Sequence, residues 1–238
     1  MEEIIRTEAL CRTFQSGDTE VQAVKNVALH IETGTLTALR GRSGSGKTTT
    51  LNMLSGLDTP TSGDIWLDGK QISAMGENER DRFRRYEIGF IFQSVALIAQ
   101  MSAYENVEFG LRLAGYPAKE RALRAQECLS FVGLKKRMHH RPAELSGGEQ
   151  QRVAIARAIA HKPKVIFADE PTAELDTVMG LQVMRVFRDL VQKEGTTVLL
   201  TSHDPNMMEL VDHVYTLQDG EIVDETFNTA ALPEEVRP

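Results

Sequence analysis

The chain contains little cysteine: Cys11 and Cys128 are the only two among 238 residues. Because they lie far apart in the sequence, neither a disulfide framework nor a cysteine metal motif is indicated, and two unpaired thiols fit a reducing cytosol. Tryptophan is scarcer still, and the single Trp66 is expected in the core more than as a platform for a ligand. The overall composition, with 41% hydrophobic and 26% charged residues, is that of a globular protein.

Long apolar runs and an excess of positive charge are also missing. No apolar stretch approaches the roughly 20 residues that a membrane-spanning helix needs, so another chain would have to supply any membrane spans. Residues 1–5 are acidic and lack the basic-then-apolar order of a signal peptide, so we expect no secretory leader. The net charge of −7 argues against a chain built mainly to bind nucleic acid, although a local basic patch stays open.

One stretch, Gly41-Arg42-Ser43-Gly44-Ser45-Gly46-Lys47-Thr48, fits the phosphate-loop pattern G-x-x-x-x-G-K-[ST]. Its glycines let successive backbone N–H groups converge on a phosphate. Lys47 adds a cation for the β- and γ-phosphates, Thr48 offers a hydroxyl to Mg²⁺, and the following helix points its positive end at the anion. A strand is expected at 36–40 before the loop and an apolar helix at 48–57 after it, which is the setting that the motif needs. The alternative, a solvated glycine-rich surface turn, would not require this setting.

Strand and helix patterns alternate along most of the chain, which predicts an α/β fold. Two loosely alternating strands, 4–14 and 21–31, precede the phosphate loop. The later strands are expected at 64–69, 88–92, 164–168, 197–201, 214–217 and 221–223, and the helices at 77–86, 178–193 and 205–211. The continuous apolar runs near 164 and 197 are typical of strands in the middle of a parallel sheet.

Between these parts, residues 94–161 contain no convincing strand. Helices are expected at 104–113, 119–132 and 148–161. An all-helical segment that interrupts an α/β pattern indicates an inserted lobe. We therefore expect one domain, 1–238, in which 1–93 and 162–238 form the core and 94–161 form the lobe; the polar tail 226–238 ends it.

Polar residues follow several of the expected strands. Asp169 can hold the shell of Mg²⁺ and Glu170 can orient or polarise the attacking water, while Pro171 ends the strand. His203 follows the next buried strand and therefore falls on the same sheet edge, within reach of a γ-phosphate. Gln93 also ends a strand and is a candidate for sensing metal or water. A solvated turn and idle side chains are the alternative interpretation.

A second helix start with an affinity for anions lies at Leu145 to Arg152. Ser146 is a good N-cap, and Gly147 and Gly148 leave backbone N–H groups uncovered. One chain therefore carries two phosphate-recognising surfaces. If the two surfaces cannot reach the same nucleotide within one subunit, a two-fold dimer would place the phosphate loop of each copy opposite the second surface of the other copy.

Several motifs in this order resemble the nucleotide-binding subunit of an ATP-binding cassette (ABC) transporter. They are Gly41 to Thr48, Gln93, Leu145 to Glu149, Phe167 to Glu170, Leu175-Asp176 and His203. The resemblance covers nearly the whole chain. It implies a P-loop NTPase (RecA-like) core, a small antiparallel β subdomain and an inserted α-helical subdomain, with two subunits sandwiching two ATP molecules head to tail.

The resemblance also implies an ATPase, which converts ATP and water to ADP and phosphate. Its catalytic residues would be Glu170 as base, His203 and Lys47. The implied nucleotide-binding residues are Phe14, Gly41, Arg42, Ser43, Gly44, Ser45, Gly46, Lys47, Thr48, Thr49, Gln93, Ser146, Gly147, Gly148, Glu149 and Asp176. The implied Mg²⁺ ligands are Thr48, Gln93 and Asp169, and Asp176 falls on the loop that contacts the opposite subunit.

Further sequence segments resemble one branch of the family, which contains macrolide-efflux, lipoprotein-release and cell-division ATPases. The segments that carry it are 56–58 with 60–63, 88–93, 105–107 and 140–148. This branch implies a separate integral membrane permease, a location at the cytoplasmic face of the membrane, and export, lipoprotein extraction or mechanical signalling as the work done.

Three residues depart from the family pattern. Phe14 stands where a tyrosine often stacks on adenine, so stacking is kept without the hydroxyl. Glu149 replaces a common glutamine, and its carboxylate is expected to point away from the γ-phosphate. Glu174 adds charge near the expected dimer contact, where a small or amide residue is usual.

The segment Ser94 to Ser102 is more apolar than a free loop needs. We expect it to be a docking groove for a helix of the membrane partner, since an exposed apolar patch marks an interface. Packing within the helical lobe is the alternative. This segment lacks the proline that is common in its branch.

Two other classes of function compete. A soluble ABC ATPase acting on DNA or ribosomes typically shows a long coiled coil or two cassettes in one chain, and neither is visible. A small-molecule kinase with a phosphate loop would have no use for Leu145 to Glu149.

Overall fold

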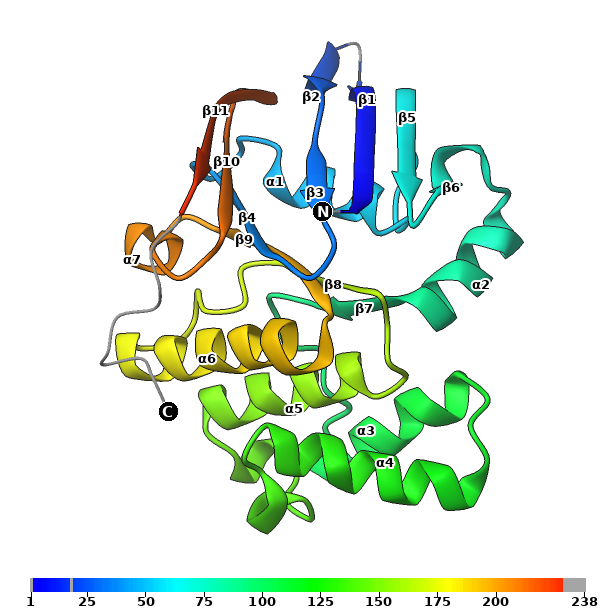
Figure 1. Ribbon diagram of the computed structural model, residues 1–238, viewed down its shortest axis with the longest axis vertical. Helices are drawn as coiled ribbons and strands as arrows, with labels where there is room; N and C mark the ends of the chain where they lie inside the picture. The colour runs from blue at the N-terminus through cyan, green and yellow to red at the C-terminus, as the bar shows by residue number, and fades with distance from the viewer. Residues whose placement is uncertain (1, 18, 229–238) are drawn as a thin grey trace.

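Two sheets and a set of helices form the structure, a computed structural model that describes residues 2–17 and 19–228 (Figure 1). Within these residues the larger sheet has six strands in the order β11-β10-β4-β9-β8-β7. They are β4 (Leu36–Arg40), β7 (Ile88–Ile91), β8 (Val165–Ala168), β9 (Thr197–Ser202), β10 (His213–Gln218) and β11 (Glu221–Phe227). The strands from β10 to β7 are mutually parallel, and β11 pairs antiparallel with β10. The carboxyl ends of β4, β9, β8 and β7 therefore share one edge.

The smaller sheet is antiparallel. Among the described residues it contains five strands, ordered β2-β1-β5-β6, with β3 paired to the first part of β1. Their bounds are β1 (Glu3–Ser16), β2 (Thr19–Val27), β3 (His30–Glu32), β5 (Ser62–Leu67) and β6 (Lys70–Gln71). In Figure 1 this sheet lies above β4, β9, β8 and β7 of the larger sheet, and the β10–β11 hairpin stands to its left.

Helices cover the larger sheet. They are α1 (Lys47–Leu54), α2 (Glu77–Glu87), α3 (Ala103–Leu113), α4 (Ala118–Phe131), α5 (Gly147–Ile159), α6 (Thr177–Glu194) and α7 (Pro205–Met208), with short 3₁₀ turns η1 (Ile72–Ala74), η2 (Lys135–Arg137) and η3 (Pro142–Glu144). Between β7 and β8 the described chain is helical or irregular, as expected for residues 94–161. None of the helices in the described ranges combines the length and apolarity that a membrane crossing requires.

Alternation along the buried strands separates two cores. In β8, Val165 and Phe167 face a core shared with α1 and the smaller sheet, whereas Ile166 and Ala168 face a core shared with α3 to α6. Because successive side chains of a strand point to opposite faces, the large sheet has apolar contacts on both sides. Gly89 of β7 allows the close approach of α5, since a Cβ there would lie 2.6 Å from the carbonyl oxygen of Ala158.

The expected α/β architecture is confirmed, and most predicted elements end within a few residues of their predicted positions. The predicted strand 21–31 is wrong, because it is divided into β2 and β3. The buried hydroxyl of Thr7 donates to the carbonyl oxygen of Val27 at 3.1 Å and accepts from the N–H of Leu29 at 2.9 Å, so a side chain takes the place of the strand ladder there. The predicted helix 205–211 is also shorter, since α7 ends at Met208.

Two further expectations differ from the structure. Trp66 is only half-buried, and the guanidinium of Arg6 lies 4.2 Å from its ring centroid, so it covers the edge of the core instead of filling it. The tail expected from residue 226 begins later, because β11 continues to Phe227 and pairs with β10. Residues 229–238 of that tail lie outside the described part of the chain.

One tyrosine ties the two sheets together. The phenol of Tyr215, on β10, donates to the carbonyl oxygen of His30 at 2.7 Å, and it accepts from the N–H of His30 at 3.2 Å. Burial raises the pKa of Tyr215, so the phenol keeps its proton at any working pH.

Replacing this hydroxyl tests its contribution. We expect Tyr215→Phe to lower the free energy of unfolding by about 1–3 kcal/mol, because the backbone groups of His30 lose their buried partner. Urea denaturation measures the change, with Tyr86→Phe as the control, since the Tyr86 side chain is 44% exposed. Equal stabilities for the two variants would contradict this role.

Candidate functional site

The loop between β4 and α1 is held in place by close backbone contacts. Gly46, the N-cap of α1, has a φ of 100°, and a Cβ there would lie 2.5 Å from the carbonyl oxygen of Ala23. A Cβ on Gly41 would overlap the carbonyl oxygen of Leu217. Only glycine fits these two positions without a backbone shift, so these contacts fix the path of the loop.

Lys47 lies inside this loop and is only 4% exposed. Its ammonium donates to the carbonyl oxygen of Gly41 at 2.9 Å and to that of Arg42 at 3.1 Å. It also lies 3.6 Å from the carboxylate of Glu170. The carbonyl oxygens of the loop therefore position the Lys47 ammonium, and the carboxylate of Glu170, which follows β8, is its acidic neighbour.

The ends of the neighbouring strands bring the other predicted residues to the same edge. The Thr48 hydroxyl donates to Asp169 Oδ1 at 3.0 Å. His203 Nδ1 lies 3.2 Å from Glu170 Oε2. Glu170 has a φ of 43°, a left-handed conformation that is unusual for a residue with a side chain and is often found at functional sites. Lys47, Thr48, Asp169, Glu170 and His203 thus form one cluster.

Thr201 belongs to this cluster and was not predicted from the sequence. Its buried hydroxyl donates to Asp169 Oδ1 at 2.7 Å and accepts from the backbone N–H of Glu170 at 2.8 Å. From the neighbouring strand β9 it therefore holds the two acids that follow β8. A threonine inside an apolar strand is an ordinary strand former, so its sequence position two residues before His203 was the only available signal.

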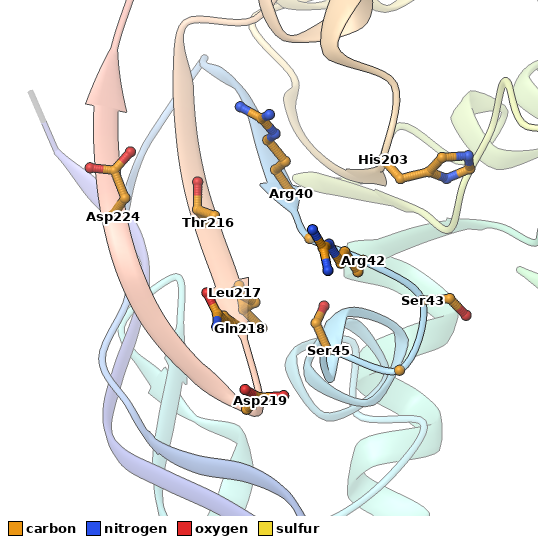
Figure 2. Close-up of a pocket in the computed structure, with 12 residues that line it drawn as sticks. Arg40, Arg42, Ser43, Ser45, His203, Thr216, Leu217, Gln218, Asp219 and Asp224 are labelled. Carbon is orange, nitrogen blue, oxygen red and sulfur yellow. The ribbon is translucent and has the colours of Figure 1, made fainter.

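A pocket of about 660 Å³ adjoins the phosphate loop (Figure 2). Its walls are residues 40–45 of β4 and the loop, His203 after β9, and residues 216–219 and 224 of the β10–β11 hairpin. The turn of this hairpin supports the loop, because the N–H of Gly220 donates to the carbonyl oxygen of Ser45 at 3.1 Å. Ser43 and Gly44 are exposed at the tip, and Thr49 lies in the first turn of α1.

Gln93 and Phe14 lie outside the cluster around Lys47 and Glu170. Gln93 lies exposed beyond β7 and makes no hydrogen bond to another candidate residue in the described ranges. Phe14 lies on β1 and is 40% exposed, and the guanidinium of Arg12 covers its ring at 4.6 Å. Arg12 is held there by Asp58 at 2.8 Å.

The second predicted helix start is capped by its own side chains. Ser146 accepts from the N–H of Glu149 at 3.3 Å, and Glu149 accepts from the N–H of Ser146 at 2.9 Å. This backbone hydrogen bond, aided by the charge of Arg137, lowers the pKa of Glu149. The Glu149 carboxylate is thus directed back to the cap and to Ser146.

The start of α5 packs against the start of α6. Gly148 leaves no room for a side chain, because a Cβ would lie 2.8 Å from the sulfur of Met179, and one on Gly147 would lie 3.5 Å from Leu175. Asp176 is the N-cap of α6, where it accepts from the N–H of Met179 at 2.9 Å. This capping role was not predicted.

The phosphate loop and the α5 start lie on different faces of the large sheet. Helix α1 contributes Leu51 and Leu54 to the core on the side of the antiparallel sheet. Helix α5 contributes Val153 and Ile155 to the core on the other side, where it packs against α3, α4 and α6. Figure 1 shows α1 above the sheet and α5 below it. The structure therefore does not bring Ser146 into the cluster around Lys47.

The segment Ser94 to Ser102 is pinned to the helices around it. Arg157 donates to the carbonyl oxygens of Ala96 at 2.6 Å and Val95 at 3.1 Å. Asn106 donates to the carbonyl oxygen of Ile98 at 3.2 Å, and Val95 and Leu97 pack against the helical core. Packing within the helical part of the chain thus explains part of its apolar character.

The family model described as ABC transporter matches residues 24–173. An uncharacterized ABC transporter ATP-binding protein of Methanocaldococcus jannaschii is 43% identical over 221 residues, which cover 93% of this chain and 98% of that protein. The macrolide export ATP-binding/permease protein MacB of Brucella melitensis is 43% identical over 223 residues, 94% of this chain but 34% of MacB. The chain thus spans about a third of the length of this larger relative.

Solved structures agree with the sequence relatives. A dimeric, post-hydrolysis structure of the ATP-binding cassette MJ0796 bound to ADP and Pi has a TM-score of 0.88 and 37% identity. It covers 96% of this chain and 100% of that one. The similarity confirms the predicted P-loop NTPase fold.

Removing the Thr201 hydroxyl tests its part in the cluster. We expect Thr201→Val to lower the rate of ATP hydrolysis about 10- to 100-fold, because the Asp169 carboxylate and the Glu170 backbone N–H each lose a positioning hydrogen bond. ATP affinity measured without divalent metal is expected to change little, whereas the Mg²⁺ concentration needed for half-maximal activity rises. Thr201→Ser, which keeps the hydroxyl, is the control; a serine variant as slow as the valine variant would contradict the assignment.

Proposed function

Because the chain belongs to the ABC transporter family and is an ATPase, we propose that it dimerises on Mg-ATP and drives a separate membrane protein from the cytoplasmic face. The observation that carries the proposal is the cluster at the sheet edge, where Lys47, Thr48, Asp169, Glu170 and His203 meet. The work done would be export, lipoprotein extraction or mechanical signalling across the membrane.

In this mechanism the phosphate loop binds the triphosphate through its backbone N–H groups. Lys47 leaves the carbonyl oxygens that it now bonds and pairs with the β- and γ-phosphates. Phe14, with Arg12 behind its ring, offers its other face to the adenine. Gln93 follows a strand of the same sheet edge and would approach the metal and water only when the site closes.

The residues present fit Mg²⁺. Thr48 and Asp169 offer the hard oxygen ligands that this ion prefers, and their oxygens lie 3.0 Å apart. No group of three or more His, Cys, Asp or Glu residues in the described ranges forms a metal cage, which fits an ion that keeps water and phosphate ligands. When bound, Mg²⁺ supplies charge neutralisation at the phosphate oxygens.

Glu170 would act as the catalytic base. One of its oxygens lies 3.2 Å from His203 and the other 3.6 Å from Lys47, so both neighbours orient the carboxylate. A water in line with the γ-phosphate would give its proton to Glu170 as it attacks phosphorus. His203, whose side chain is 60% exposed, would then contact the γ-phosphate from the pocket side.

The homodimer follows from the separation of the two phosphate-recognising surfaces. Since α1 and α5 bury their apolar sides in different cores, Ser146 cannot complete the site of its own chain without unpacking α5. A two-fold axis would place the Ser146 hydroxyl and the N–H groups of Gly147 and Gly148 against the phosphate held by the partner. The dimeric state of the MJ0796 cassette supports this arrangement.

A membrane partner is supported by the relatives. MacB is named as an ATP-binding and permease protein, and about two thirds of its length has no counterpart in this chain. We propose that a segment of the partner lies beside Ser94 to Ser102, in a groove of about 340 Å³ between α2 and α3. Phe90 and Leu113 give this groove apolar walls, and Arg157 joins it to the carbonyl oxygens of Val95 and Ala96.

The dimer is tested by changing the base. We expect Glu170→Gln to stop hydrolysis while leaving ATP binding intact, so that the protein stays dimeric in saturating Mg-ATP. Light scattering after size exclusion measures the mass, with Glu209→Gln, an exposed glutamate outside the site, as the control. A monomeric Glu170→Gln protein that has bound Mg-ATP would contradict the proposal.

The loop cation is tested separately. We expect Lys47→Ala to weaken ATP binding about 10- to 100-fold, since a charged hydrogen bond to phosphate is lost, and to abolish turnover. Fluorescent-nucleotide titration and phosphate release measure the two effects. Lys136→Ala is the control for losing an exposed lysine, and an unchanged hydrolysis rate in Lys47→Ala would remove Lys47 from its role.

A further inference from the structure

Two arginines beside the phosphate loop have no acidic partner within their own chain. Arg40 ends β4 and Arg42 lies in the loop, and both side chains are exposed in the 660 Å³ pocket (Figure 2). Neither forms an ion pair with a residue of the described ranges. The acids that line the same pocket, Asp219 and Asp224, belong to the β10–β11 hairpin on its other wall. The pocket therefore has an unneutralised basic side next to the loop.

An acid without a partner lies on the other surface that the dimer would use. Glu174 is exposed on the loop between β8 and α6 and pairs with no cation in the described part of the chain. Its neighbour Leu175 packs under Gly147 at the start of α5, and Asp176 is engaged as the cap of α6. These contacts hold the loop that carries Glu174 against the start of α5, so Glu174 and Ser146 belong to one surface of the chain.

We propose that Glu174 of one copy forms an ion pair with Arg42 of a second copy, with Arg40 as the adjoining cation. The inference rests on the head-to-tail dimer proposed above. When Ser146 of one copy faces the phosphate loop of the other, Glu174 arrives at the flank of that loop, where Arg42 stands. The receiving surface is the basic side of the pocket, and the partner is a second copy of this chain.

The ion pair would offset part of the electrostatic repulsion between the two copies. Each chain carries a net charge of −7, so two copies repel each other at long range. A two-fold axis forms the pair twice in one dimer, once on each side of the axis. Asp219 and Asp224 repel a carboxylate from the hairpin wall, so the charges of the pocket also direct Glu174 toward Arg42 and fix the register of the two copies.

The test is a charge exchange in the Glu170→Gln background, with ATP and Mg²⁺ kept saturating for each variant by titration. We expect Arg42→Glu and Glu174→Arg each to raise the dimer dissociation constant about tenfold or more, and the double variant to return to within about threefold of the starting protein. Sedimentation velocity measures the constant. Glu174→Gln, which keeps the size of the side chain, should weaken the dimer by a smaller factor.

The control is Glu194→Arg, the same change of charge at the far end of α6, which should leave the constant unchanged. Higher salt screens the general repulsion in both proteins but the ion pair only in the starting protein, so the ratio of the two dissociation constants, Glu174→Gln to starting protein, should fall as salt rises. If the starting protein stays monomeric, the proposed dimer itself fails. If it dimerises but the reversals have no effect, or the double variant is as weak as the two singles combined, the Glu174–Arg42 pair is overturned and the dimer stands.

Discussion

One carboxylate oxygen joins the three strands on which the site depends. Asp169 Oδ1, at the end of β8, accepts from Thr48, which follows β4, at 3.0 Å and from Thr201 of β9 at 2.7 Å. These bonds are possible because parallel strands end at the same edge of the sheet, so residues far apart in sequence come within hydrogen-bond distance. Thr201 extends the network to the backbone N–H of Glu170, a residue with a left-handed φ of 43°. Positioning, and not an unusual side chain, makes this edge competent for phosphate chemistry.

The same architecture separates the two surfaces that recognise phosphate. The large sheet has an apolar core on each face, and the phosphate loop and the α5 start are anchored to different cores. Neither can move to the other without losing packing that stabilises the fold. A second copy of the chain removes this conflict without any change in the subunit, and the unpaired charges of Arg42 and Glu174 lie on the two surfaces that would meet.

Much of the fold could be predicted from the sequence, because buried parallel strands are short apolar runs and the phosphate loop has a specific pattern. Strand 21–31 could not be predicted as two strands, since the break depends on a hydroxyl of Thr7 from another strand. Lys47 and Thr48 could be predicted from the phosphate-loop pattern, and Asp169, Glu170 and His203 from their places after buried strands. Thr201 and the capping role of Asp176 could not, because threonine is common in strands and a cap is recognisable only once the helix boundary is known.

An experimental structure of the Glu170→Gln protein loaded with Mg-ATP would show directly whether each phosphate is shared between two copies. The distance to determine joins the Ser146 hydroxyl of one copy to the γ-phosphate held by Lys47 of the other. The account predicts hydrogen-bond contact, about 3 Å, with the N–H groups of Gly147 and Gly148 turned to the same phosphate. A loaded structure in which Ser146 lies far from every neighbouring γ-phosphate would contradict it.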